Sequence, residues 1–173
     1  MVALNEMEYD LEGYYSLDGQ RGAQKGLLTL CGDGKIIGSI WDDNSGGGNH
    51  SDKKFLLGIR NLKEHTLSFL KISPGTRART DLIPIIWHLD LDSEERGIET
   101  YQGAWADASY VIGTEEMERL VLGQGIEDQI SRAKQLPFEL LKESYFNPEQ
   151  MPRLKLDGER YGQTGGVVLT PRT

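Results

Sequence analysis

Short apolar segments separated by turn-forming residues run through residues 9–105, with no helical pattern between them, and this punctuation constrains the fold more than any other feature. In Tyr9–Leu17, every second residue is apolar, aromatic or glycine, which is the period-two pattern of a strand buried on one side. Asp33 and Gly34 separate two such segments and are typical of a tight hairpin turn. Strands joined by short turns, without crossover helices, pair antiparallel.

Seven segments are expected to form strands. Residues 115–122 have two interpretations: a helix capped by Thr114, or an eighth strand at Met117–Leu122 that closes a barrel. Sequential hairpins of this kind indicate an all-β fold, either an up-and-down barrel or a sandwich. Of the two we predict the antiparallel up-and-down eight-stranded barrel, with short C-terminal helices. The seven expected strands are Tyr9–Leu17, Leu27–Cys31, Ile36–Trp41, Phe55–Arg60, Thr66–Ser73, Leu82–Leu91 and Ile98–Trp105, and residues 18–22 are expected to form a loop.

The pattern changes after about residue 113. Ile126, Ile130 and Ala133 recur at helical spacing, and Pro137 is expected to end that helix. Residues 152–173 contain little apolar material, so we expect a loosely held tail there. The sequence therefore predicts a β-barrel domain at 1–122, followed by a helical extension and loosely held tail at 123–173.

Charge and composition limit the partners and the compartment. The chain of 173 residues has 27 acidic and 19 basic residues, a net charge of −8, which argues against a nucleic-acid or anionic-membrane surface. Cys31 is the single cysteine, so no internal disulfide can form. Met1–Leu11 contains three acids and no apolar core of a signal peptide, and no apolar run is long enough to span a membrane. We expect a soluble, cytoplasmic protein.

Four short motifs resemble the calycin type of barrel, the group that holds lipocalins and avidins. The resemblance implies a barrel with an internal cavity. The Gly-X-Trp start typical of lipocalins is replaced here by glycine and two tyrosines, and the biotin-contact pattern of avidins is not recognisable, so the resemblance implies no particular ligand. The motifs are Gly13-Tyr14-Tyr15, Asp33–Gly38, Leu67–Lys71 and Tyr101–Trp105.

Large aromatic residues on five of the expected strands are candidates for the wall of an internal pocket. An eight-stranded barrel has an interior just wide enough to be filled by side chains or to hold one small ligand. Aromatic side chains could build a pocket for an apolar or planar molecule, or they could fill the core instead. The candidate ligand-binding residues are Tyr14, Trp41, Phe69, Lys71, Trp87, Tyr101 and Trp105.

The catalytic residues of an enzyme cannot be assigned from the sequence, and two polar residues are the candidates. Lys71 shares a strand face with Leu67 and Phe69, so it could point inward, where desolvation would lower its pKa and let it anchor a carboxylate or enolate. It could equally reach the rim of the barrel and face water. His88 and Asp90 share the opposite face of their strand from Trp87, and could form a general acid–base pair or lie in solvent.

Cofactor and metal signatures are absent from the sequence. Asp42, Asp43, His50 and Asp52 crowd one segment without the spacing of a closed site. Asp90, Asp92 and Glu94 start like a calcium loop, but Glu95 stands where the turn glycine is needed. The glycines at 32, 34 and 38 precede a strand and open no helix, so they do not form a nucleotide cradle. We expect neither a metal nor a cofactor.

Three functions fit these observations. The first is a small-molecule-binding barrel for an apolar or aromatic ligand. The second is a cofactor-independent cyclase or isomerase, similar to a pericyclase, that acts on a polyene or carbonyl substrate in biosynthesis, since such catalysis needs shape and one or two polar groups. The third is a protein-interaction module. Homodimerisation is an open alternative.

Overall fold

The computed structural model describes residues 6–42, 53–72, 85–107 and 126–172. These residues form eight β-strands and three α-helices, and all three helices precede the last strand. The strands are β1 (Met7–Leu17), β2 (Gln20–Leu30), β3 (Lys35–Asp42), β4 (Lys54–Asn61), β5 (Thr66–Ile72), β6 (Ile85–Glu95), β7 (Ile98–Asp107) and β8 (Gln163–Pro171). The helices are α2 (Ile126–Lys134), α3 (Phe138–Ser144) and α4 (Met151–Arg160).

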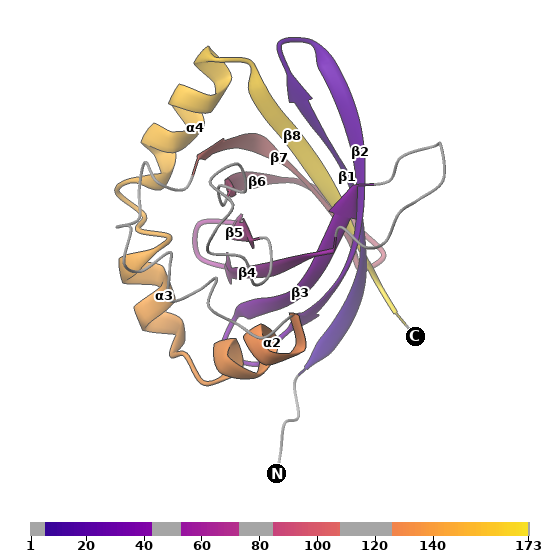
Figure 1. Ribbon diagram of the computed structural model, residues 1–173, viewed down its shortest axis with the longest axis vertical. Coiled ribbons are helices and arrows are strands. Elements are labelled where there is room, and N and C mark those ends of the chain that lie inside the picture. The colour runs from indigo at the N-terminus through magenta and orange to yellow at the C-terminus, as the bar shows by residue number, and fades with distance from the viewer. Residues whose placement is uncertain (1–5, 43–52, 73–84, 108–125, 173) are drawn as a thin grey trace.

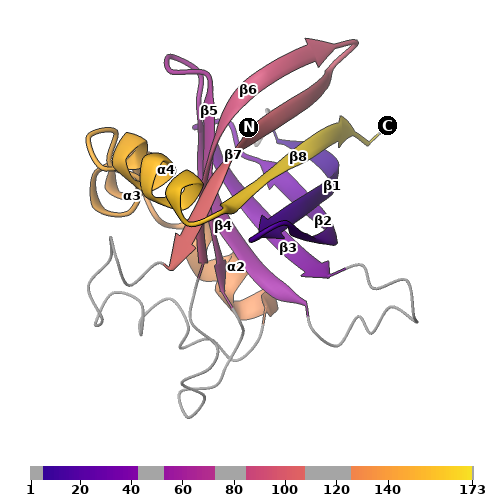
Figure 2. The same ribbon diagram turned by 90° about the horizontal axis from the view of Figure 1, so that it is seen from above.

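The strands close into a barrel. Each strand pairs antiparallel with its neighbour in sequence, and β8 pairs with both β7 and β1. Figure 1 shows the ring of strands with the helices along one side, and Figure 2 shows the same arrangement from above. This strand order is that of an up-and-down barrel. The predicted all-β fold, an antiparallel eight-stranded barrel with short helices toward the C-terminus, is confirmed.

The closing strand lies where the sequence predicted a loosely held tail, and that prediction is wrong. Leu169 pairs with Leu11 on one side and with Glu99 on the other, and its side chain is 2% exposed. The barrel therefore uses residues on both sides of the boundary expected at residue 122. Both interpretations of residues 115–122, helix or closing strand, lie outside the described residues.

Two-residue turns make the hairpins longer than expected. Asp18 and Gly19 connect β1 to β2 with φ angles of 50° and 86°, the pair of positive values that a type I′ turn needs. Because this turn is so tight, β2 begins at Gln20, and the loop expected at 18–22 is wrong. Arg96 and Gly97 make an equivalent turn between β6 and β7, with φ angles of 56° and 82°.

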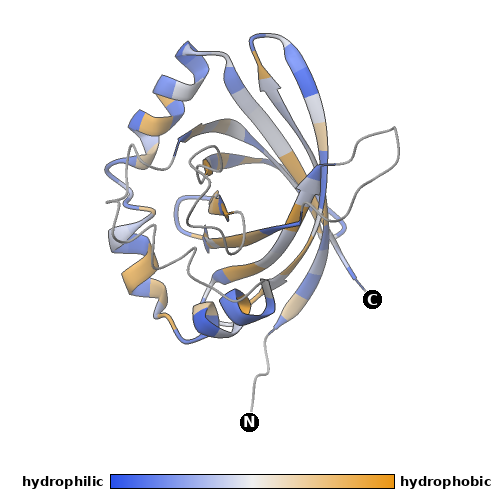
Figure 3. Ribbon diagram, in the orientation of Figure 1, coloured by the Kyte–Doolittle hydropathy of each residue, from blue (hydrophilic) through white to orange (hydrophobic). Residues whose placement is uncertain are grey.

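Two layers of apolar side chains hold the structure together. Inward side chains, among them Leu11, Ile40 and Leu67, form the core inside the barrel. Outward side chains of β3 to β6 form a second core with the helices, where Leu57 packs among residues such as Leu154. The apolar colouring of these strands is visible in Figure 3. Helix α2 packs on β3 and β4, α3 on β4, and α4 on β6, β7 and β8.

None of the helices in the described part of the chain is long and apolar enough to cross a membrane.

The role of β8 in closing the barrel can be tested with two neighbouring substitutions. Leu169→Ala removes a buried side chain from the inner core and should lower the free energy of unfolding by ~2–4 kcal/mol. Thr170→Ala changes an exposed residue of the same strand and should alter it by less than ~0.5 kcal/mol. Urea unfolding measures both variants. Equal effects of the two substitutions would contradict the closing role of β8.

Candidate functional site

A cavity of about 190 Å³ lies at one end of the barrel, where β1 ends and β8 begins. We call it the barrel-end cavity. It is larger than a cavity of about 150 Å³ that accepts benzene, and four of its lining residues are partly exposed, so solvent can reach it. The lining residues are Tyr15, Asp42, Lys71, Ile85, Trp87 and Trp105.

Strand alternation and register bring these residues together. On each strand every second side chain points inward, and the lining residues all occupy inward positions of β1, β3, β5, β6 and β7. Lys71 pairs with Ile85 across β5 and β6, and Trp87 pairs with Trp105 across β6 and β7. Directly opposed residues on one face have Cβ atoms about 4.5–5.5 Å apart, so these pairs form one continuous wall.

The Lys71 side chain is the cationic group of the cavity. The residue is only 9% exposed, and its Nζ donates hydrogen bonds to Gln24 Oε1 at 3.2 Å and to Asp42 Oδ1 at 3.5 Å. It also lies 5.6 Å from the centre of the Tyr15 ring, within range of a cation–π contact. Desolvation lowers the pKa of Lys71 below that of an ordinary lysine, the Asp42 charge opposes this, and the Lys54 charge adds to it.

Trp87 and Trp105 form the aromatic wall of the cavity, and Phe69 stacks on Trp87. Trp87 is parallel to Phe69 at a centroid distance of 5.7 Å, and it is tilted by 34° against Trp105 at 6.2 Å. Trp105 Nε1 donates a hydrogen bond to the carbonyl oxygen of Thr164 at 3.1 Å, whereas the buried Nε1 of Trp87 has no acceptor among the described residues. A buried donor without an acceptor is costly, so this indole N–H is an unsatisfied polar group inside the barrel.

The aromatic wall depends on a glycine in the closing strand. A Cβ atom at Gly165 would lie 2.4 Å from Cζ3 of Trp87, which no real contact allows. The indole ring therefore packs directly on the backbone of β8. Any larger residue at this position would displace the ring that lines the cavity.

The structure separates the seven candidate ligand-binding residues into three groups. Lys71, Trp87 and Trp105 line the barrel-end cavity, and Phe69 supports Trp87 from behind. Tyr101 points inward at the opposite end of the barrel. The expectation that Tyr14 and Trp41 share this internal pocket is corrected: both lie on the outer wall, where Arg21 and Lys53 respectively approach their rings.

Sequence reasoning missed Tyr15, Gln24, Asp42 and Ile85. Tyr15 could have been found, because it shares the period-two face of Tyr9, and Tyr14 necessarily points the other way. The other three gave no comparable signal. Gln24 stands before the segment expected to be the second strand, and Asp42 and Ile85 stand at strand ends, where alternation is hardest to read.

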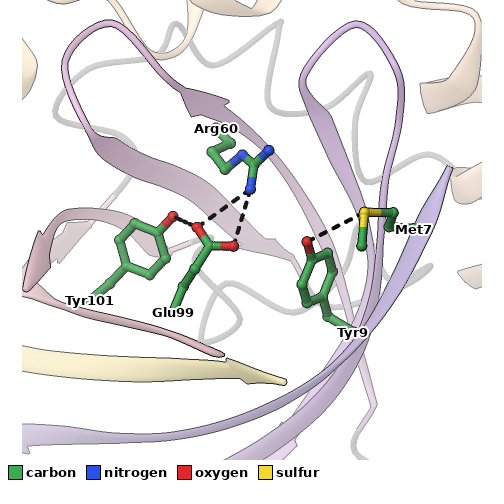
Figure 4. A network of polar contacts seen from close by, with 5 residues as sticks. All are labelled: Met7, Tyr9, Arg60, Glu99 and Tyr101. Atoms are coloured by element: carbon green, nitrogen blue, oxygen red, sulfur yellow. Dashed lines mark hydrogen bonds and ion pairs between the residues drawn. The ribbon is translucent and has the colours of Figure 1, made fainter. Parts of the chain in front are cut away.

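The opposite end of the barrel is held by a polar network (Figure 4). The hydroxyl of Tyr101 donates to Glu99 Oε1 at 2.5 Å, and Arg60 Nη1 donates to Glu99 Oε2 at 3.1 Å. Burial and the Glu99 carboxylate both raise the pKa of the Tyr101 phenol. Tyr9 donates to the sulfur of Met7 at 3.8 Å. Because its acceptor is a charged partner within the network, Tyr101 has a structural role at this end.

His88, the other catalytic candidate, lies on the outer wall and so does not meet Lys71. Its Nδ1 is 2.7 Å from Ser68 Oγ, and the residue is 7% exposed. Burial lowers its pKa to about 4, while Asp90 raises it and Lys155 lowers it. Lys155 forms an ion pair with Asp90. The imidazole is therefore neutral at pH 7, and with so low a pKa it is a weak general base.

A second cavity of about 230 Å³ adjoins His88 between β4–β6 and the segment that joins α3 to α4. We call it the outer cavity. It brings no third polar group into contact with the Ser68–His88 pair among the described residues, and no group of three or more histidine, cysteine, aspartate or glutamate residues in the described ranges could hold a metal ion. The lining residues are Ile59, Asn61, Glu64, Thr66, Ser68, His88, Asp90, Phe146, Pro148, Met151 and Pro152.

Because Tyr101 has a structural role, we predict that loss of its hydroxyl lowers the free energy of unfolding. Tyr101→Phe removes a hydrogen bond to a buried carboxylate and should lower the free energy of unfolding by ~1–3 kcal/mol. Tyr9→Phe, whose hydroxyl contacts a thioether, should lower it by less than ~0.5 kcal/mol. Urea unfolding compares the two. Equal losses in the two variants would contradict this assignment.

The buried His88 predicts an acid-sensitive stability. The unfolded histidine titrates near pH 6.5 and the folded one near pH 4, so between these values the unfolded chain binds the extra proton. The titration of His88 therefore leaves the free energy of unfolding nearly unchanged well above pH 6.5. As the pH falls toward 4 it lowers this free energy, by ~2 kcal/mol at pH 5. Urea unfolding at pH 7 and pH 5 should show this extra loss in the wild type relative to His88→Gln. Parallel pH profiles would show that His88 titrates normally.

No protein-family model matches the chain, and no curated protein or solved structure is similar enough to it to count as a match. The candidate site is therefore defined by its own geometry. That geometry is a small cavity at one end of a closed barrel, with two tryptophan rings on its wall and one buried lysine among its lining residues.

Proposed function

We propose that the protein binds a small planar ligand with an oxygen acceptor in the barrel-end cavity. The observation that supports this most directly is the position of Lys71, a buried cation whose side chain lines a mostly apolar, aromatic cavity. Burying an amine costs free energy that an apolar side chain of similar length would avoid. A ligand that accepts a hydrogen bond from this amine would offset that cost and would explain why a lysine stands at this position.

The size and shape of the cavity indicate a single ring. A volume of about 190 Å³ exceeds that of a benzene-sized site and falls below the ~300–1,000 Å³ of sites for drug-sized ligands. The wall formed by Trp87 and Trp105 favours a flat molecule, because aromatic rings gain most from stacked or edge-to-face contact. The ligand, or the part of it that enters the barrel, is thus a small aromatic or planar group.

An unused donor on Lys71 favours an oxygen on that ring. The Lys71 ammonium has three N–H groups, and the described residues supply two acceptors, Gln24 and Asp42. A carboxylate, amide or carbonyl oxygen could take up the remaining N–H of Lys71, with charge assistance when the amine is protonated.

The proposal includes a relationship to calycin-type barrels and a small-molecule partner for a cytoplasmic protein. The up-and-down order of eight antiparallel strands supports the relationship, as does the Gly13-Tyr14-Tyr15 motif within β1. The ligand-sized cavity supports binding of a small molecule over a purely protein-interacting role.

A cofactor-independent cyclase or isomerase is the second candidate. The observation that favours it is the Lys71–Asp42 ion pair at 3.5 Å beside the cavity, which offers a proton donor and a proton acceptor to one bound molecule. Native mass spectrometry of the protein from its own source would identify the chemical class of a retained ligand. Turnover of that ligand would assign the enzyme, and binding without turnover would assign the carrier.

The binding proposal can be tested with benzoate as the probe and tryptophan fluorescence as the readout. Trp87 and Trp105 line the cavity, so benzoate should change the emission on binding. Lys71→Met should weaken the Kd at least tenfold, because a charge-assisted hydrogen bond contributes ~1.5–3 kcal/mol. Toluene, which lacks the oxygen acceptor, should bind wild type and Lys71→Met alike.

Tyr14→Phe is the matched control variant, because Tyr14 lies on the outer wall and should leave the Kd for benzoate unchanged. Circular dichroism verifies that each variant is folded. Unchanged benzoate affinity in folded Lys71→Met would contradict the proposal.

A further inference from the structure

The chain has two well-buried lysines in the described ranges, and their surroundings differ. Lys35 is 6% exposed, and its Nζ donates to the carbonyl oxygens of Lys134 at 3.0 Å and Leu136 at 2.8 Å, with Asp33 3.1 Å away. Three fixed oxygens thus surround this amine. Lys71 Nζ has longer contacts, at 3.2 Å and 3.5 Å, and its residue lines a cavity that solvent can reach.

We propose that Lys71 forms an imine with a small aromatic aldehyde or ketone bound in the barrel-end cavity. This inference rests on the proposed function and names the substrate class of the same site, a carbonyl compound. An amine on the wall of an aromatic cavity meets a bound carbonyl carbon at high effective concentration, which is the main requirement for imine formation.

The step balances with the groups present. The Lys71 ammonium first gives a proton to the Asp42 carboxylate, whose Oδ1 is 3.5 Å away. The neutral amine attacks the carbonyl carbon, a C–N bond forms and the π bond of C=O breaks. One proton then moves from nitrogen to that oxygen, which gives a carbinolamine. The protonated Asp42 then returns its proton to the carbinolamine hydroxyl, which leaves as water while the nitrogen lone pair forms the C=N bond. The product is a protonated imine that keeps the third proton of the original ammonium on nitrogen, and Asp42 is again a carboxylate. No oxidant or reductant is required.

The electrostatic surroundings favour a reactive amine. The charged and titratable groups around Lys71 are Asp42 on β3, Lys54 on β4 and Tyr15 on β1. Desolvation is the strongest of the influences on its pKa and favours the neutral, nucleophilic form; Lys54 acts in the same direction and Asp42 against it. Hydrophobic desolvation of a lysine is one of the general ways in which proteins activate it for imine formation.

The experiment traps the imine by reduction. The chain of 173 residues is incubated with benzaldehyde and sodium cyanoborohydride at pH 7.5, and peptide mapping by mass spectrometry locates the benzyl groups. We expect Lys71 to be modified at least tenfold faster than Lys35 or any exposed lysine. In Lys71→Met this fast phase should disappear, whereas Lys63→Met, a change in the exposed β4–β5 turn, should leave it unchanged.

Benzyl alcohol gives a test that does not depend on a variant. It has the shape of benzaldehyde but cannot form an imine, so saturating benzyl alcohol should slow modification of wild-type Lys71 at least fivefold and leave exposed lysines unaffected. Modification spread over lysines according to exposure, or a Lys71 rate insensitive to benzyl alcohol, would overturn the inference.

The two proposals fail in distinguishable ways. If benzyl alcohol changes the tryptophan emission and benzaldehyde does not modify Lys71 preferentially, the imine inference is wrong and ligand binding stands. If benzyl alcohol and benzoate both leave the emission unchanged and Lys71 is not modified, both proposals are wrong.

Discussion

The pairing of β8 with β1 on one side and β7 on the other is the interaction on which the rest of the structure depends. Without it, both neighbours would have open edges with unpaired backbone groups. The pairing also sets the distance between two sides of the cavity, because β8 lies between β1, which carries Tyr15, and β7, which carries Trp105. Gly165 pairs with Tyr15, and the carbonyl oxygen of its neighbour Thr164 accepts the hydrogen bond of the Trp105 indole. The segment that closes the barrel therefore also positions two walls of the candidate site.

Glycines inside the barrel leave space that the aromatic rings of the core need. Gly165 leaves the space that the Trp87 ring occupies, and at Gly58 a Cβ atom would lie 2.0 Å from the carbonyl oxygen of Ser68 on the neighbouring strand. Both glycines occupy inward positions, where curved strands approach most closely. The rings of Phe69 and Trp87 fill the interior that the glycines leave free. The barrel-end cavity lies beyond these rings, where side chains no longer fill the interior.

The sequence was sufficient for seven strands because their alternation is punctuated by clear turns, and it was insufficient for the eighth. Residues 163–171 follow a helix and contain two adjacent glycines, and their only apolar run, Val167–Leu169, is short. The sequence therefore predicted a loosely held tail. The segment forms a strand because it pairs with β1 and β7, which are distant in the chain. Within the site, period-two spacing from Leu67 made Lys71 an inward candidate. Choosing Tyr14 instead of Tyr15 was an error of one residue, and in a strand one residue reverses the face.

The two ends of the barrel differ in how completely their buried charges are paired. This difference is why we place the proposed binding function at one of them. At one end, Glu99 is bonded by both Arg60 and Tyr101, so its charge is compensated within the protein. At the other end, Lys71 is desolvated, its contact to Asp42 is long, and the side chain lines an open cavity. A fully paired buried charge can be explained by structure alone, whereas an incompletely paired one costs stability that an apolar residue would avoid. The contacts to Gln24 and Asp42 leave Lys71 incompletely paired, and the ligand oxygen or carbonyl group that we propose would complete its pairing.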